Sequence, residues 1–234
     1  LAGLGYISRI SGDLNTAMKY LIEAKGLSDA TEILQALVYV NLGSLYNLLG
    51  DNLQSLQAYE YGLEMARLHS DIRYEGEALM GIANIYAQRT EYSESIKYVK
   101  QSLDLNIETQ QLSGQLRAAN NLAAIYCHAG DYQNAQSVVD EFLPLMDKEA
   151  FTFESIYLLA TAGEVHYYQD NYQRALLLLE QALDLSQSSQ IVEPTPAILV
   201  SISMVYKEQQ DVQREIEVLH DAIAVSEEVR HLDS

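Results

Sequence analysis

The chain has 234 residues, of which 48% are hydrophobic and 20% are charged, so it is long enough to bury a sizeable core. Fourteen lysines and arginines stand against thirty-three aspartates and glutamates, which gives a formal net charge of −19. Nucleic-acid-binding and anionic-membrane-binding surfaces both need clustered basic residues, so this charge argues against either partner and favours a basic one.

Targeting and redox signals are absent from the sequence. No apolar run approaches the length of a membrane span, and the N-terminus lacks the pattern of a signal peptide. The single cysteine cannot form an internal disulfide. We therefore expect no membrane insertion and a cytoplasmic location, with the periplasm as the alternative. Because the first residue is Leu rather than Met, we expect a fragment of a longer protein or a processed chain.

The sequence repeats with a period of 40 residues. Similar segments begin at Gly3, Asn41, Gly81, Asn121, Thr161 and Ser201. The first two starts are 38 residues apart, and every later pair of neighbouring starts is 40 residues apart. A repeat of this length is typical of stacked arrays of helices. We expect a single domain of six units, at approximately residues 1–28, 29–70, 71–110, 111–150, 151–190 and 191–234.

When the six copies are aligned, the residues at one equivalent position form a column. Two such columns predict how the first helix of each unit packs. A small residue recurs at Gly5, Gly43, Ala83, Ala123, Gly163 and Ser203. Three residues later, on the same helix face, the column holds Ser8, Tyr46, Tyr86, Tyr126, His166 and Tyr206. We expect the small residue to let two helices approach closely, and the rings to pack beside that contact.

Further columns predict a turn and then a second helix. The turn column holds Gly12, Gly50, Thr90, Gly130, Asp170 and Gln210. The small contact position of the second helix holds Ala17, Ser55, Ser95, Ala135, Ala175 and Glu215. Its core position holds Leu63, Leu103, Leu143, Leu183 and Ile223. Each unit is therefore expected to be a helical hairpin, which can bury its apolar face only by stacking on its neighbours.

Prolines predict two irregularities. Pro144 lacks an amide hydrogen and should end or kink the second helix of the fourth unit early. Pro194 and Pro196 follow a polar loop, so the first helix of the sixth unit should begin near Pro196.

The stretch AANNLAAIYCHAGDY places Cys127 beside His128 and, three residues on, Asp131. Adjacent helix residues point in different directions, and Asp131 belongs to a turn that starts a helix, so these three do not form a triad. The other histidines show no spacing typical of a metal site. We interpret Cys127 as a small thiol on a groove-side helix face. We expect no enzymatic activity, no catalytic residue, no metal and no cofactor.

The segment AAIYCHAGDYQNA resembles the tetratricopeptide repeat, and the 40-residue spacing is similar to the variant in kinesin light chains, Leu-Gly-Asn-type adaptors and bacterial regulators. Thr90, His166 and Glu215 depart from its pattern. The resemblance implies an all-α, right-handed superhelical solenoid of about six hairpins. It also implies that the first helices line a concave groove, which receives an extended peptide or a partner helix.

Positions between the packing columns should face this groove. They are Tyr6, Ser44, Asn47, Asn84, Gln88, Arg117, Asn120, Tyr157, Glu164, Tyr167, Tyr168 and Lys207. We expect Asn84 and Asn120 to hold the backbone of an extended chain, because an amide side chain offers both donors and acceptors. We expect an aromatic and acidic patch that binds a basic or aromatic side chain of the partner. It consists of Tyr157, Glu164, Tyr167 and Tyr168.

Three functions stay open at this point. The first is a protein-interaction scaffold that binds a protein or peptide, of basic character, in the groove. The second is a sensory or regulatory segment of a bacterial signalling protein or transcription regulator, which binds a small ligand or self-associates. The third is an enzyme, which would need a deep pocket that the columns do not reveal. Some family members clamp a terminal carboxylate, but the corresponding columns here contain no Lys or Arg, which argues against that ligand.

Overall fold

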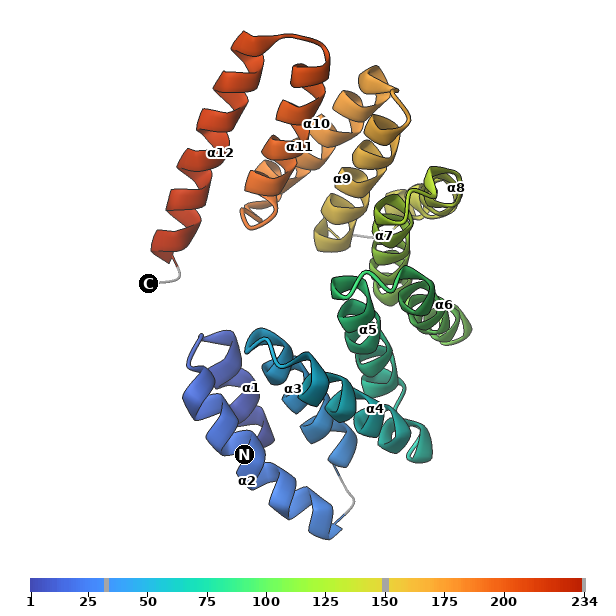
Figure 1. The fold of residues 1–234 in the computed structure, drawn as a ribbon, viewed down its shortest axis with the longest axis vertical. Coiled ribbons are helices and arrows are strands. Elements are labelled where there is room, and N and C mark those ends of the chain that lie inside the picture. The colour runs from blue at the N-terminus through green and yellow to red at the C-terminus, as the bar shows by residue number, and fades with distance from the viewer. Residues whose placement is uncertain (32–33, 149–151, 233–234) are drawn as a thin grey trace. The chain divides into compact units, whose positions relative to one another are not determined.

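The computed structural model describes residues 1–31, 34–148 and 152–232, and within these the chain forms twelve α-helices, one 3-10 helix and no strand. The helices are α1 Ala2–Ile10, α2 Leu14–Thr31, α3 Gln35–Leu48, α4 Asn52–Leu68, α5 Ile72–Gln88, α6 Tyr92–Glu108, α7 Leu112–His128, α8 Tyr132–Phe142, η1 Leu143–Lys148, α9 Thr152–Tyr168, α10 Tyr172–Ser189, α11 Thr195–Glu208 and α12 Val212–Leu232. Consecutive helices run as antiparallel pairs (Figure 1), which confirms the predicted all-α hairpins.

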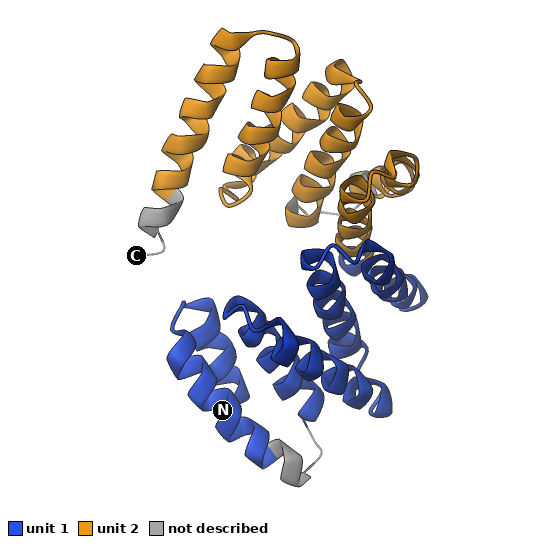
Figure 2. Ribbon diagram, in the orientation of Figure 1, with its two compact units in different colours: residues 1–114 blue, residues 115–234 orange. Residues whose placement is uncertain are grey.

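The chain divides into two compact units (Figure 2). Unit 1 comprises Leu1–Gly114 and unit 2 comprises Gln115–Ser234. The single-domain organisation expected from the sequence stays a prediction. The expected boundary between repeats 111–150 and 151–190 lies outside the described residues.

The predicted small-residue column is buried at the contact between the two helices of each hairpin. A Cβ atom added to Gly43 of α3 would lie 2.8 Å from the ring of Tyr59 on α4. At Gly163 of α9 it would lie 2.6 Å from Cγ of Leu179 on α10. These separations are shorter than a carbon–carbon contact allows, so the close approach of the helices depends on the missing side chain.

The small position on the second helix completes this contact. The Ser55 hydroxyl donates a hydrogen bond to the carbonyl oxygen of Gly43 at 2.7 Å, and Ser95 does the same to Ala83 at 2.8 Å. Both serines are fully buried, as are the alanines that replace them in other hairpins. Serine is tolerated there because its hydroxyl is satisfied across the contact.

The turn column adopts a left-handed backbone conformation. Gly50 has a φ of 77°, and the non-glycine residue Thr90 has a φ of 60° at the equivalent position. The next side chain often caps the following helix, as where Asp51 accepts a hydrogen bond from the backbone N–H of Gln54. A second left-handed column, which sequence analysis missed, lies between hairpins at Ser70, Gln110 and Gln190.

The predicted core column of the second helix is confirmed at Leu63 and Leu103, which are buried. The prediction is wrong at Ile223, whose side chain is 60% exposed. This residue lies on α12, which among the described residues contacts α11 and no other helix. A repeat position is buried only where a neighbouring helix covers it, and the face carrying Ile223 has no such neighbour.

The proline predictions are confirmed. Helix α8 ends at Phe142, and the six-residue 3-10 helix η1, which contains Pro144, continues it. Helix α11 begins at Thr195 with Pro196 in its first turn, where a missing backbone N–H costs nothing. Within the described ranges, no helix has both the length and the apolar character needed to cross a membrane.

The close contact of α3 with α4 should make Gly43→Ala destabilising. The new methyl group meets the buried ring of Tyr59, so we expect the free energy of unfolding to fall by about 1–3 kcal/mol. Gly76→Ala in α5 is the matched control, because its Cβ would lie 3.9 Å from Leu105. There the higher helix propensity of alanine should stabilise the protein by about 0.5–1 kcal/mol in denaturant unfolding. Equal effects at both sites would contradict the predicted contact.

The left-handed turn should make Thr90→Gly stabilising. A β-branched residue at a φ of 60° is strained, so glycine should raise the free energy of unfolding by about 1 kcal/mol. Thr90→Ala separates the backbone strain from the loss of the hydroxyl hydrogen bond. It keeps the Cβ atom that causes the strain and loses the hydrogen bond to the Arg89 carbonyl. Urea denaturation of both variants is the measurement, and a glycine variant no more stable than the alanine variant would contradict the strain.

Candidate functional site

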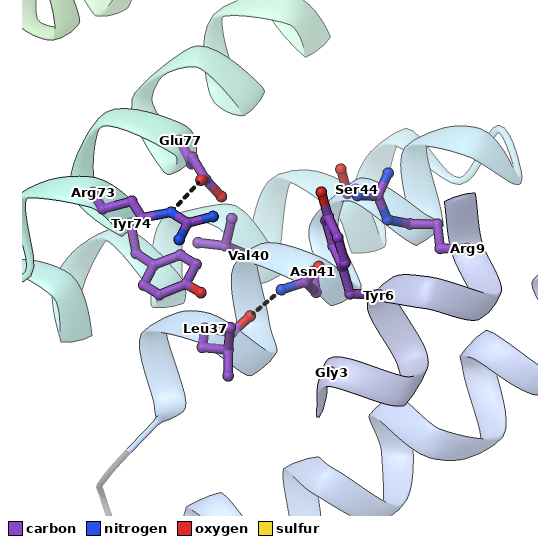
Figure 3. A pocket seen from close by; sticks show the side chains of 10 residues that line it. All are labelled: Gly3, Tyr6, Arg9, Leu37, Val40, Asn41, Ser44, Arg73, Tyr74 and Glu77. Carbon is purple, nitrogen blue, oxygen red and sulfur yellow. Dashed lines mark hydrogen bonds and ion pairs between the residues drawn. The ribbon is translucent and has the colours of Figure 1, made fainter. Parts of the chain in front are cut away.

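Unit 1 has a cavity of about 230 Å³ lined by the first helices of its three hairpins, α1, α3 and α5. Figure 3 shows Tyr6 and Arg9 of α1 on one side and Arg73, Tyr74 and Glu77 of α5 on the other, with α3 between them. Helix α3 contributes Leu37, Val40, Asn41 and Ser44. Of these residues, the sequence predicted Tyr6 and Ser44 as groove residues.

An ion pair and two cation–π contacts hold the arginines of the unit 1 cavity. The Nε atom of Arg73 donates to Glu77 at 3.1 Å, and this contact raises the pKa of Arg73. The guanidinium groups of Arg73 and Arg9 lie over the rings of Tyr74 and Tyr6, at 5.5 and 5.3 Å from their centroids. Such distances allow cation–π attraction.

Unit 2 has a cavity of about 200 Å³ between α7 and α9. Its lining includes three predicted residues, Arg117, Asn120 and Tyr157. The Thr161 hydroxyl donates to the side-chain oxygen of Asn120 at 2.7 Å, and the Asn120 amide nitrogen donates to Asn121 at 3.3 Å. The amide of Asn120 is therefore already engaged within the protein, and holding a peptide backbone would use its remaining hydrogen-bonding capacity.

A second unit 2 cavity, of about 170 Å³, surrounds Glu164. Glu164, Tyr167 and Tyr168 reach it from α9, and it is also lined by His128, Leu179, Ser201 and Met204. The Ser201 hydroxyl donates to Oε1 of Glu164 at 2.8 Å. Burial raises the pKa of Glu164, while the hydrogen bond from Ser201 and the nearby His128 partly oppose this rise.

The tyrosines of this second cavity form an aromatic cluster. The ring of Tyr168, which is 40% exposed, stacks on Tyr132 with centroids 5.3 Å apart and planes at 5°. Tyr167 meets Tyr168 edge-on at 5.3 Å and Tyr172 at 6.0 Å. Glu164 and the two neighbouring tyrosines, predicted as one patch, therefore share one cavity, whereas Tyr157 lines the other.

The remaining predicted groove residues do not line these cavities. The side-chain oxygen of Asn47 accepts a hydrogen bond from Gln88 at 3.1 Å, which links α3 to α5. Asn84 on α5 and Lys207 on α11 are exposed. The predicted set is thus distributed over both units, and its role in binding stays a prediction.

Cys127 and His128 are neighbours in sequence but lie in different surroundings in the structure. The Cys127 thiol, assigned above to a groove-side helix face, is only 7% exposed. Burial, with a smaller contribution from Glu164, raises its pKa to about 12, so the thiol stays protonated near neutral pH. His128 is exposed and lines the cavity around Glu164. The thiol is therefore a packing residue of α7.

The repeat register contained a signal for several cavity residues that sequence analysis missed. Arg9 shares its column with Asn47 and Lys207, and Glu77 shares its column with Arg117 and Tyr157. Comparison of these columns alone would have selected both residues. The ion pair between Arg73 and Glu77 has no such signal, because it depends on side-chain geometry.

Comparisons with known proteins agree with this architecture. Residues 114–188 match the tetratricopeptide repeat family model. No curated protein sequence matches the chain. Among solved structures, BtubC (BKLC) from P. vanneervenii is similar with a TM-score of 0.74 and 18% identity, over 93% of this chain and 91% of that chain.

Two further solved structures have the same fold. The kinesin light chain repeats of Podosopora anserina give a TM-score of 0.63 and 16% identity, over 85% of this chain and 97% of that chain. A Rap protein complexed with competence and sporulation factor gives a TM-score of 0.76 and 14% identity, over 91% of this chain and 59% of that chain. Residues 114–188 therefore belong to the tetratricopeptide repeat family, and the chain as a whole has the tetratricopeptide repeat fold.

Proposed function

We propose that the chain is a non-enzymatic protein-interaction scaffold, and that the cavity around Glu164 binds a lysine or arginine side chain of a partner protein or peptide. The tetratricopeptide repeat fold supports a scaffold role in general. The more specific proposal is carried by one observation, which is a half-buried carboxylate in a cavity lined by tyrosines.

Glu164 has the electrostatic properties of a cation site. One carboxylate oxygen accepts the Ser201 hydrogen bond, and no Lys or Arg among the described residues forms an ion pair with Glu164. A carboxylate that is desolvated but not neutralised gains more from a cation than an exposed carboxylate does. A basic side chain would supply the missing charge.

The tyrosines and the size of the cavity favour the same ligand. A cation near the rings of Tyr167 and Tyr168 would gain cation–π attraction in addition to its ion pair. The volume of about 170 Å³ is below the ~300–1,000 Å³ of typical small-molecule pockets. One amino-acid side chain is therefore a better match than a free metabolite, which favours the scaffold over the small-ligand sensor.

The charge of the whole chain supports a basic partner. A formal charge of −19 attracts cationic segments over several ångströms and raises their association rate. Separately from charge, the similar Rap protein was solved in complex with competence and sporulation factor, so a protein of this fold can form a complex with a partner.

Replacement of Glu164 should abolish most of the affinity for a basic peptide. The isosteric Glu164→Gln keeps an acceptor for Ser201 and loses the charge, so a peptide with a single lysine between alanines should bind at least about tenfold more weakly in isothermal titration calorimetry. The acetyl-lysine form of the peptide should bind the wild-type protein equally weakly.

Glu180→Gln is the matched control for this experiment, because it removes the same charge from an exposed position on α10 of the same unit. We expect its affinity to stay within about twofold of wild type. If both variants lose affinity equally, the attraction is non-specific and the assignment of the cavity is wrong. If the lysine peptide binds no better than its acetylated form, no cation site exists there.

The raised pKa of Glu164 predicts the pH dependence of this binding. Because a cation pairs with the ionised carboxylate, affinity should increase as pH rises through the raised pKa and then level off. Without peptide the sign is opposite, since the folded chain holds this proton more tightly than the unfolded chain. The contribution of Glu164 to stability is then complete below its ordinary pKa of 4.5 and is lost as pH rises through the raised value.

Titration calorimetry and urea denaturation over a pH series measure these two trends. Both series use a His128→Asn background, which removes the neighbouring imidazole, and the difference between this background and its Glu164→Gln variant reports Glu164. The Glu164→Gln variant should keep only the pH dependence of the other titratable groups, so the part due to Glu164 should be missing from its profile. A background profile with the same shape as that of the glutamine variant would show that Glu164 does not control binding.

A further inference from the structure

We propose that the unit 1 cavity binds the acidic side chain of a peptide, an aspartate or a glutamate, whose carboxylate pairs with Arg9. This site has the opposite charge preference to the cavity around Glu164, lies in the other unit, and does not depend on the function proposed above.

The charge of the unit 1 cavity is opposite to that of the chain. The whole sequence has fourteen lysines and arginines against thirty-three acidic residues, yet this cavity is lined by two arginines and one glutamate. With Arg9, Arg73 and Glu77 ionised, the lining carries a net charge of +1. An anionic group of single charge would neutralise it.

Among the described residues, one donor of the Arg9 guanidinium is unsatisfied. Its Nε atom is buried and has no hydrogen-bond partner, and no ion pair to Arg9 is found within residues 1–31, 34–148 and 152–232. Arg73, by contrast, already donates to Glu77 at 3.1 Å. Leaving a shielded, charged donor unpaired is unfavourable, so a carboxylate that reaches Arg9 would restore a strong, charge-assisted hydrogen bond.

The surroundings of Arg9 hold its guanidinium in place for a ligand. It lies over the ring of Tyr6, with 5.3 Å between the guanidinium carbon and the ring centroid. Figure 3 shows both residues on the α1 side of the cavity, with Ser44 of α3 near them. The side chain of Asn41 is fixed by its hydrogen bond to the Leu37 carbonyl at 2.8 Å. Polar side chains that are already held in place lose less conformational entropy when a ligand binds.

The lining also selects among anions. A phosphate carries nearly two negative charges and would lie in a cavity that already contains Glu77, whereas a carboxylate matches the net charge of +1. The volume of about 230 Å³ is below that of typical small-molecule pockets. An aspartate or glutamate side chain, delivered by a peptide along the first helices, meets both constraints.

The test uses the full chain and short peptides. The probe is acetyl-Ala-Ala-Glu-Ala-Ala-amide, and its glutamine counterpart controls for size and backbone. In ¹⁵N spectra that report arginine Nε–H groups, we expect the glutamate peptide to shift the Arg9 signal saturably. The glutamine peptide should not shift it. Arg9→Met should weaken binding of the glutamate peptide by about tenfold, measured on the amide signals of Asn41 and Ser44.

Two further variants keep this test decisive. Arg89→Gln removes an equal charge from unit 1, at an exposed residue paired with Glu91, and should change affinity by less than about twofold. Arg9→Lys retains the charge without the Nε donor and should bind with intermediate affinity, and it serves if Arg9→Met proves unstable in urea denaturation.

Several results would overturn the proposal. They are the absence of a saturable shift, an equal response to the glutamine peptide, and an equal loss of affinity in Arg89→Gln. A response to free acetate as strong as that to the peptide would show a site for small carboxylates only. Tighter binding of a phosphoserine peptide would assign the cavity to phosphate. Lysine-peptide binding at Glu164 is measured separately in unit 2, so failure of one proposal leaves the other standing.

Discussion

The geometry of unit 1 depends on one packing constraint, in which the ring of Tyr59 packs against two glycines, Gly43 and Gly81. A Cβ atom on Gly43 of α3 would lie 2.8 Å from this ring, and a Cβ atom on Gly81 of α5 would also collide with it. The ring of Tyr59, which belongs to α4, is 5% exposed and its burial raises the pKa of its hydroxyl. One side chain therefore sets the approach of two successive first helices, and hence the width of the cavity that they line.

Cavities recur at the same register of the repeat in both units. Leu37, Val40 and Asn41 of α3 line the unit 1 cavity, and 80 residues later, two repeat periods on, Arg117, Asn120 and Asn121 line a cavity in unit 2. On the neighbouring helix, the positions of Arg73, Tyr74 and Glu77 correspond to those of Phe153, Glu154 and Tyr157. The packing columns are conserved between the copies while these positions change chemistry. The fold thus repeats the cavity, and the lining residues set the chemistry of each copy.

Residue spacing predicted the parts of this structure that each repeat shares. The hairpins, the glycine contact and the turn at Gly50 depend on local rules applied at every copy, so agreement between copies identifies them. The burial of Cys127 and the hydrogen bond from Thr161 to Asn120 were not predicted, because they depend on which side chain of a neighbouring helix reaches a position. Ile223 shows the converse, since it keeps the column pattern without a helix to cover it. Residue spacing therefore predicts on which face of its helix a residue lies, and only the packing of neighbouring helices determines which side chains it contacts.

The two proposed sites differ in how local and long-range electrostatics combine. At Glu164 the local carboxylate and the net charge of −19 both attract a basic ligand, so screening by salt weakens both contributions. At Arg9 the local guanidinium attracts an acidic ligand while the rest of the chain repels it. Salt screens that repulsion as well as the attraction, and a partly shielded ion pair is screened less than the exposed charges around it. The acidic surface therefore speeds the approach of basic segments and slows that of acidic ones, so binding at Arg9 must come from contacts within the cavity.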